Sequence, residues 1–301
     1  VGITRPCTKH NWLVKDTEKL AETLHQAFHV ATKGRPGPVL VDIPKDVQFA
    51  TGTYSSPREA RVSHYQPKVK GDIKAITELV EMMEKAERPI FYTGGGVINS
   101  GPAASQLLRE LADATGIPVT STLMGLGAYP ASGKGWIGML GMHGLYEANL
   151  AMHGCDLMIN IGARFDDRIT GRIADFSPRS KKVHIDIDPS SINKVIHVDI
   201  GIVGDVGHVL EDMLNVWKAR GRKVNKAGLA GWWGKIEQWK LKKCLTYKGS
   251  DKIIKPQYAL ERLEALTRGR DRYITTEVGQ HQMWAAQFLH FDEPNRWMTS
   301  G

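Results

Sequence analysis

Short apolar runs alternate with amphipathic segments over most of the chain. From residue 71 onward, apolar positions recur with a helical period at 72–86, 102–115 and 144–153. Between these segments lie five apolar runs that the pattern predicts to be strands: Pro89–Thr93, Pro118–Thr122, Asp156–Gly162, Lys182–Asp188 and Ile200–Asp205. Alternating strands and helices predict a parallel sheet covered on both faces. We therefore expect an α/β protein built from three-layer domains.

The residues before 71 carry a separate pattern. Residues 17–33 have a helical period with Asp16 as the predicted N-cap, and the run Pro38–Pro44, closed by prolines, predicts a buried strand. Residues 51–67 are rich in glycine, serine and proline and show little periodicity, which is typical of a linker between domains. A first domain is thus predicted to end near residue 53.

A third pattern follows the basic, tryptophan-containing segment 224–250. Pro256–Thr267 is amphipathic and predicts a helix, and Tyr273–Glu277 predicts a strand. Because the first residue is Val1 and the chain stops just after a strand start at Trp297, we interpret it as an internal fragment. The predicted division is 1–53 as the end of one domain, 54–69 as a linker, 70–220 as a complete domain, 221–254 as a linker, and 255–301 as the start of another domain.

Composition and charge narrow the class of protein. With 42% hydrophobic and 24% charged residues and no apolar run long enough to cross a membrane, the chain is predicted to be a cytoplasmic enzyme. The net charge of +8 is spread along the sequence, so nucleic-acid binding is not predicted. Cys7, Cys155 and Cys244 form no CxxC pair, which argues against a disulfide framework and a zinc site.

Glycine and charged residues gather where the predicted strands end, which is where ligands bind in open parallel sheets. Gly94–Gly96 permits close approach of a backbone to a ligand, although it does not complete a GxGxxG pattern and equally suits a tight turn. Asp186 lies at the end of a later predicted strand. In dinucleotide-binding folds, an acidic residue at such a position binds a ribose hydroxyl. These residues favour a nucleotide site.

The segment 162–168 adds two arginines around the acidic pair Asp166 and Asp167. Arg164 and Arg168 suit the binding of a pyrophosphate or a carboxylate, and a structural ion-pair network is the alternative. Arg35 stands between turn residues and suits the same role, or simply ends a helix. Gly138–Gly144 is a soft apolar segment suited to lie against a flat ring or to line a core.

Five ordered segments together resemble the large catalytic subunits of the acetohydroxyacid synthase (acetolactate synthase) family, which use thiamine diphosphate. The segments are Thr8-Lys-His-Asn-Trp-Leu-Val, Gly34-Arg-Pro-Gly-Pro-Val-Leu-Val-Asp-Ile-Pro-Lys-Asp-Val, Met139-Leu-Gly-Met-His-Gly, Gly162-Ala-Arg-Phe-Asp-Asp-Arg and Val278-Gly-Gln-His-Gln-Met-Trp-Ala-Ala-Gln. The resemblance implies that 1–53 ends a pyrimidine-binding domain, that 70–220 is a Rossmann-like FAD-binding domain, and that 255–301 begins a diphosphate-binding domain.

The resemblance also assigns roles to individual residues. The implied FAD contacts are Arg35, Gly94, Gly95, Asn99, Thr122, Leu123, Met142, His143, Gly162, Ala163, Arg164, Asp186, Ile187, Gly204, Asp205 and Val206. The implied start of the thiamine diphosphate site is Val278, Gly279, Gln280 and His281. Arg168 is implied to receive the carboxylate of the acceptor keto acid, with Lys45, Met142 and Asp167 lining the substrate channel.

The activity implied by the resemblance is carboligation in branched-chain amino-acid biosynthesis. Pyruvate is decarboxylated on thiamine diphosphate, and its hydroxyethyl unit is joined to a second 2-keto acid, either pyruvate or 2-ketobutyrate. The implied cofactors are thiamine diphosphate, Mg²⁺ and a structural FAD, and the implied partners are further copies of the subunit and a small regulatory subunit. The family's glutamate and its metal-binding Gly-Asp-Gly segment are absent from these 301 residues, so the chain alone is expected to be inactive and to hold no metal.

Two other functions remain open at this point. One is a related pyruvate oxidase that uses FAD and thiamine diphosphate and in which the flavin accepts electrons. The Arg168 loop and the segment Met139–Gly144 favour the synthase over that oxidase. The other is a nucleotide-binding fragment without catalysis.

Overall fold

The computed structural model describes residues 1–56 and 65–300 and divides the chain into two compact units. Unit 1 comprises residues 1–69 and unit 2 comprises residues 70–301. Half of the predicted linker 54–69 falls on residues 57–64, which lie outside the described residues, so that part of the domain division stays a prediction.

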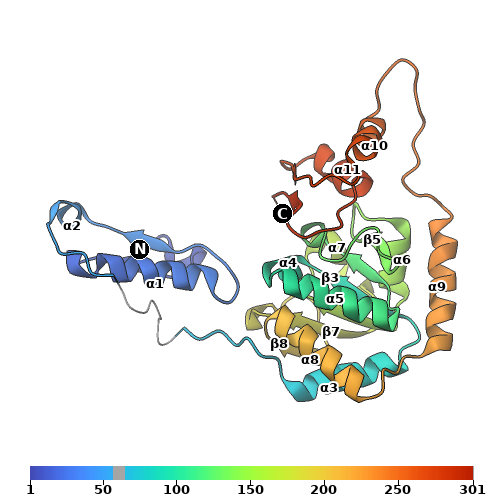
Figure 1. The fold of residues 1–301 in the computed structure, drawn as a ribbon, viewed down its shortest axis with the longest axis horizontal. Coiled ribbons are helices and arrows are strands. Elements are labelled where there is room, and N and C mark those ends of the chain that lie inside the picture. Colours follow the sequence, from blue (N-terminus) through green and yellow to red (C-terminus); the bar gives the residue numbers. More distant parts are fainter. Residues whose placement is uncertain (57–64, 301) are drawn as a thin grey trace. The chain divides into compact units, whose positions relative to one another are not determined.

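Unit 1 contains a two-stranded parallel sheet and a helix of 13 residues (Figure 1). Strand β1 (Asn11–Leu13) pairs with β2 (Leu40–Asp42), α1 (Leu20–Thr32) runs between them in sequence, and α2 (Lys45–Phe49) follows. The predicted N-cap is displaced by one turn: Asp16 caps the 3₁₀ turn Thr17–Lys19 by accepting from Glu18 N at 3.0 Å, and α1 continues from that turn.

Unit 2 is built on one six-stranded parallel sheet with the order β5-β4-β3-β6-β7-β8, which confirms the predicted α/β class. The strands are β3 (Pro89–Thr93), β4 (Val119–Ser121), β5 (Trp136–Met139), β6 (Leu157–Ile161), β7 (Lys181–Asp186) and β8 (Ile200–Val203). Five of them follow the predicted runs closely. The order runs outward in both directions from the β3–β6 pair, which is the arrangement of a doubly wound fold.

Strand β5 was not among the predicted strands. The sequence reads as a flexible segment from Gly138, yet Gly138 and Met139 close a strand that pairs with β4. Gly138 has a φ of +96°, and a Cβ there would lie 2.1 Å from Cδ1 of Leu145. Because close packing requires a glycine here, and glycine is disfavoured in strands, residue propensities do not predict β5.

Helices cover both faces of this sheet. One face carries α3 (Ile73–Lys85), α5 (Pro102–Thr115) and α8 (Val206–Ala219), whose apolar positions pack against Phe91, Ile159 and Val183. The other face carries α6 (Tyr146–Gly154) and α9 (Lys226–Lys240), which pack on Ile90 and Met158. Alternate residues of each buried strand therefore serve opposite layers.

Helix α9 lies within the segment 221–254 that the sequence suggests is a linker. Its Leu229, Trp232 and Ile236 are buried against α6 and β3 at helical spacing. Figure 1 shows α9 along the side of unit 2 that carries α6.

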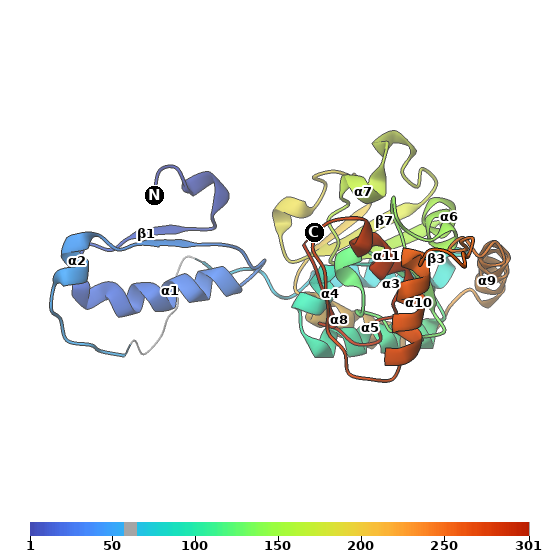
Figure 2. The ribbon, with the colours of Figure 1, turned by 90° about the horizontal axis from the view of Figure 1, so that it is seen from above.

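The last segments of the chain form a small third apolar cluster within unit 2. Helices α10 (Pro256–Thr267) and α11 (Gln280–Phe288) lie side by side (Figures 1 and 2), and β9 (Ile274–Thr275) pairs in parallel with β10 (Trp297–Met298). Ala285, Leu289 and Trp297 form an apolar cluster with Leu126 and Met139 of the sheet region. Short one-turn helices complete the unit: α4 (Gly95–Asn99) and α7 (Asp167–Thr170).

Candidate functional site

The carboxyl ends of β3 and β6 meet where the strand order reverses, and a glycine follows each strand. A Cβ on Gly94 would lie 2.3 Å from the carbonyl oxygen of Gly162, and one on Gly96 would lie 2.7 Å from Cα of Gly162. Such distances leave no room for a side chain at either position. Gly94 and Gly96 are therefore required by the close approach of two strand ends, at the place where doubly wound folds bind ligands.

Backbone hydrogen bonds join the strand ends into one continuous edge. Gly94 N donates to Ile161 O at 2.9 Å, Gly162 N donates to Ile185 O at 2.9 Å, and Gly204 N donates to Asp186 O at 3.0 Å. Thr122 N donates to Thr93 O at 2.9 Å on the other side of β3. The structure thus places the following predicted FAD residues along a single sheet edge: Gly94, Gly95, Thr122, Leu123, Gly162, Ala163, Asp186, Ile187, Gly204, Asp205 and Val206. Asn99 ends α4, the one-turn helix that starts from this edge.

The two carboxylates on this edge are both partly occupied by local hydrogen bonds. Asp186 is 7% exposed, and its Oδ1 accepts from Asp188 N at 2.9 Å. Oδ1 of Asp205 caps α8 by accepting from Gly207 N at 3.0 Å and also accepts from Ser100 Oγ at 2.6 Å. Asp205 therefore has a structural role in unit 2, whatever else it binds.

The loop after β6 presents charged side chains to solvent. Arg164 Nη2 lies 2.7 Å from Asp166 Oδ2, and Arg168 Nη1 lies 3.4 Å from Asp167 Oδ2, with all four side chains at least half exposed. Because they are exposed, these ion pairs leave both guanidinium groups accessible to an anionic ligand. Met142 N donates to Arg168 O at 2.8 Å, so the structure brings together two residues predicted for the substrate channel.

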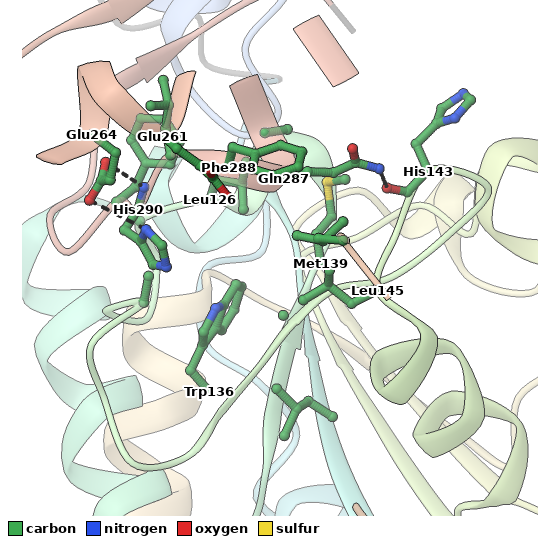
Figure 3. A pocket seen from close by; sticks show the side chains of 18 of the residues that line it. Leu126, Trp136, Met139, His143, Leu145, Glu261, Glu264, Gln287, Phe288 and His290 are labelled. Carbon is green, nitrogen blue, oxygen red and sulfur yellow. Dashed lines mark hydrogen bonds and ion pairs between the residues drawn. The ribbon is translucent and has the colours of Figure 1, made fainter. Parts of the chain in front are cut away.

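His143 lines a cavity of about 690 Å³ between β5 and the helices α10 and α11 (Figure 3). Its carbonyl accepts a hydrogen bond from Gln287 Nε2 at 2.8 Å. Apolar side chains, including Trp136 and Met139, lie between this end and the Glu264–His290 end of the cavity (Figure 3). Of the predicted FAD residues, only His143 lines this cavity, which is therefore separate from the strand edge.

Glu264 is the most enclosed charged group at this cavity, with 5% exposure. It accepts hydrogen bonds from Arg272 Nη2 and from His290 N, and His290 Nδ1 lies 3.3 Å from its Oε1. Burial alone raises the pKa of a carboxyl, but the hydrogen bond from Arg272 and the neighbouring positive charges outweigh it and hold the pKa of Glu264 below its ordinary value of 4.5.

Replacing Glu264 by glutamine is expected to lower the free energy of unfolding by about 2 kcal/mol at neutral pH, since a charged hydrogen bond is lost. A lowered folded-state pKa gives stability that is present above the unfolded-state pKa and is lost as the pH falls through the folded value. The difference between Glu264→Gln and the unchanged chain should therefore shrink below pH 4.5. Urea unfolding across this range measures it. Arg262→Gln, an exposed change on the same helix, is the control, and an equal effect of both variants at neutral pH would contradict the prediction.

The residues predicted to start the thiamine diphosphate site lie between β9 and α11. Val278 is 61% exposed, Gly279 has an extended backbone, and Gln280 and His281 open α11. No side chain of the described residues caps this helix. Gln282 N donates to Gly279 O at 3.1 Å, so the amide groups of Gln280 and His281 are the ones left to water or to a ligand.

Arg35 and Lys45 belong to unit 1. The backbone carbonyl of Arg35 accepts from Lys9 Nζ at 2.8 Å, which fixes the turn that follows α1. Lys45 opens α2, and its ammonium group lies 5.7 Å from the centre of the Phe49 ring. The structure therefore gives each residue a local role within unit 1.

Two buried polar residues near the strand edge are not predicted by the sequence patterns. Asn160 and His184 are both 0% exposed and lie within strands β6 and β7, which read as plain apolar runs. The feature of the sequence that could have identified them is a polar residue within an apolar run, since an amide or imidazole inside a buried strand requires a hydrogen-bond partner. Within residues 1–56 and 65–300, no three metal-binding side chains come together, and no helix has both the length and the apolar character needed to cross a bilayer.

Comparisons with known proteins agree with this geometry. Residues 76–213, which include all six strands of the main sheet of unit 2, match the family model "Thiamine pyrophosphate enzyme, central domain". The chain is 44% identical over 303 residues to the acetolactate synthase isozyme 3 large subunit of Escherichia coli (strain K12), and the match covers 100% of the chain and 52% of that protein.

Two further relatives give the same result. Identity is 45% to the acetolactate synthase large subunit of Haemophilus influenzae, covering 100% of the chain and 52% of the relative. It is 42% to an acetolactate synthase large subunit of Mycobacterium tuberculosis, covering 100% of the chain and 48% of the relative. The chain thus spans about half the length of these proteins. The chain is similar along its whole length to acetolactate synthase large subunits, and one of its segments matches the central domain of thiamine pyrophosphate enzymes.

Proposed function

We propose that this chain provides the FAD-binding centre and part of the thiamine diphosphate site of an acetolactate synthase. The observation that carries the proposal is the glycine pair Gly94 and Gly162 at the point where the strand order reverses, in a chain whose relatives are named acetolactate synthases. A pyruvate oxidase is not favoured, because the relatives reported above carry the synthase name.

The residues of the strand edge fit a dinucleotide in three respects. Gly94 and Gly96 let the ends of β3 and β6 lie close together, since neither position admits a Cβ, and they do so at the reversal point where doubly wound folds bind a pyrophosphate. Asp186 stands at the end of β7 with Oδ2 outside the hydrogen bond to Asp188, which suits a ribose hydroxyl. Arg164 is half exposed beside them and supplies a positive charge.

FAD would be held by this edge, and thiamine diphosphate by Val278, Gly279, Gln280 and His281 at the start of α11; Mg²⁺ is the proposed metal cofactor, and no ligand for it is assigned among these 301 residues. When bound, thiamine diphosphate supplies the electron sink for decarboxylation of a 2-keto acid. This chain's own contribution is to hold the cofactors and to receive substrate. Arg168, 72% exposed and hydrogen-bonded through its backbone to Met142, would pair with the carboxylate of the acceptor keto acid.

Pyruvate is the proposed donor substrate, and pyruvate or 2-ketobutyrate is the proposed acceptor. Lys45 and Asp167 would line the path to the reacting carbon. Assembly with further copies and with a small regulatory subunit is proposed because the relatives are described as large subunits.

Binding of FAD tests the proposal directly. We expect the purified chain to retain flavin after FAD is added and the excess is removed by gel filtration, with the bound flavin visible in the absorbance spectrum. AMP added in excess should displace part of it, because both ligands present an adenosine to the same edge. A flavin-free chain that is folded by circular dichroism would contradict the assignment of the edge to FAD.

A further inference from the structure

A row of polar side chains crosses the interior of the unit 2 sheet. Tyr92 of β3, Asn160 of β6 and His184 of β7 are direct register partners, so they point to the same face, toward α6 and α9. All three are 0% exposed. Buried polar groups are costly unless they form hydrogen bonds, so a row of this kind calls for a purpose at each position.

Asn160 and His184 both bind the backbone of one residue, Ala163. Ala163 N donates to Asn160 Oδ1 at 3.0 Å, and Asn160 Nδ2 donates to Ala163 O at 2.9 Å. His184 Nε2 lies 2.8 Å from the same carbonyl oxygen, and a carbonyl only accepts, so Nε2 carries the hydrogen. Ala163 is thus held by three hydrogen bonds from two enclosed side chains.

The next anchor is Phe165, which is 1% exposed and has a φ of +58°. A bulky residue in the left-handed region is strained and persists only where its surroundings fix it. Its ring lies 5.6 Å from the ring of Tyr92 and 5.1 Å from that of His184, measured between centroids. Arg164 therefore lies between Ala163 and Phe165, and both of these residues contact side chains of the polar row.

His184 also lies close to Asp186, the acidic residue of the strand edge. Its Nε2 lies 3.6 Å from Oδ2 of Asp186, the carboxylate that ends the same strand. One imidazole thus touches both the loop that carries Arg164 and the acidic residue of the edge.

From this arrangement we propose that Asn160 and His184 are positioning residues of the nucleotide site. They hold the backbone at 163–165 so that Arg164 is presented at the reversal point of the sheet, toward the phosphates of a bound dinucleotide. The inference rests on the proposed binding of FAD. It states that the affinity for FAD depends on two side chains that are buried within the sheet.

Three variants and one control test the inference on the 301-residue chain. Asn160→Ala removes both hydrogen bonds to Ala163, and His184→Phe keeps the ring packing while removing the donor. His184→Gln restores a donor. Ser177→Ala is the matched control, because Ser177 is also 0% exposed and bonds Met152 O and Ser180 Oγ at 2.8 Å, but at the amino end of β7.

The main measurement is the dissociation constant for FAD by flavin fluorescence, with the thermal midpoint of each FAD-free variant recorded beside it. We expect Asn160→Ala and His184→Phe to bind FAD at least about tenfold more weakly, as loss of supporting contacts behind a binding residue commonly does. Ser177→Ala should stay within about twofold of the unchanged chain even where its midpoint falls, and His184→Gln should recover most of the loss. Unchanged affinity in both Asn160→Ala and His184→Phe overturns the inference, and His184→Phe decides alone if Asn160→Ala does not fold.

Amide hydrogen exchange separates this inference from the proposed function. If the unchanged chain binds no FAD, the proposed function fails, but exchange of the Ala163 amide still decides the role of Asn160. Slow exchange in the unchanged chain and at least about tenfold faster exchange in Asn160→Ala supports a fixed backbone at this loop. Equal exchange in the two proteins overturns it.

Discussion

Replacement of Trp232 by alanine is expected to lower the free energy of unfolding by about 4 kcal/mol, the range typical of a large aromatic side chain removed from a core. Trp232 is 1% exposed and packs edge-on against Trp239, with ring centroids 5.6 Å apart. Its Nε1 donates to the carbonyl of Pro89 at 3.2 Å, which joins α9 to the first residue of β3. The variant therefore loses apolar burial and also leaves that carbonyl without its side-chain donor.

Urea unfolding followed by circular dichroism measures this change. Gln238→Ala, an exposed substitution on the same helix, should change stability by less than about 0.5 kcal/mol. A loss of under about 1 kcal/mol in Trp232→Ala would mean that α9 is only loosely attached to the sheet, contrary to the packing described above.

Gly94→Ala is expected to abolish retention of FAD and to destabilise unit 2 by about 3 kcal/mol. The new Cβ would lie 2.3 Å from the carbonyl oxygen of Gly162 and 2.7 Å from Cα of Ala163. Both contacts are with backbone, so relief requires the ends of β3 and β6 to separate. Separation of these ends would dismantle the edge to which the nucleotide is proposed to bind.

Gel filtration after addition of FAD, together with urea unfolding, checks both parts of this prediction. Gly231→Ala is the control, since nothing lies within 4 Å of its added Cβ inside α9, and it should stabilise by about 0.5–1 kcal/mol. Gly95→Ala is a milder companion whose Cβ meets Met124 at 3.3 Å, so it should stay folded and bind FAD more weakly. Full retention of FAD by Gly94→Ala would remove Gly94 from the site.

Much of the fold follows from local patterns along the chain. The run Pro89–Thr93 is confirmed residue for residue as β3, because a short apolar run bounded by charged residues and glycine has few alternatives. The packing of α9 was harder to predict, since the basic residues of 224–250 obscure Leu229, Trp232 and Ile236, although these three have helical spacing. Strand β5 was missed because Gly138 interrupts the expected composition.

The candidate site divides in the same way. That Gly94, Gly162 and Asp186 share one edge follows from their places at strand ends, and the parallel sheet confirms that they do. The pairing of Asn160 with His184 depends on strand register, which no single strand reveals. Likewise, no local rule placed Phe165 at a positive φ, because only the surrounding aromatic rings make that conformation tolerable.

The β3–β6 pairing has a consequence for how the protein reaches its binding-competent state. These strands are far apart in sequence, with α5, β4, β5 and α6 between them, so their contact forms only after a large loop of chain has closed. The floor of the proposed nucleotide site consists of Gly94 and Gly162, the glycines that follow the two strands. A ligand that binds there has no counterpart to bind in the unfolded chain, and at a concentration one hundred times its dissociation constant it stabilises the fold by about 2.7 kcal/mol. Cofactor supply would then set how much of this protein survives in a cell, independently of any turnover.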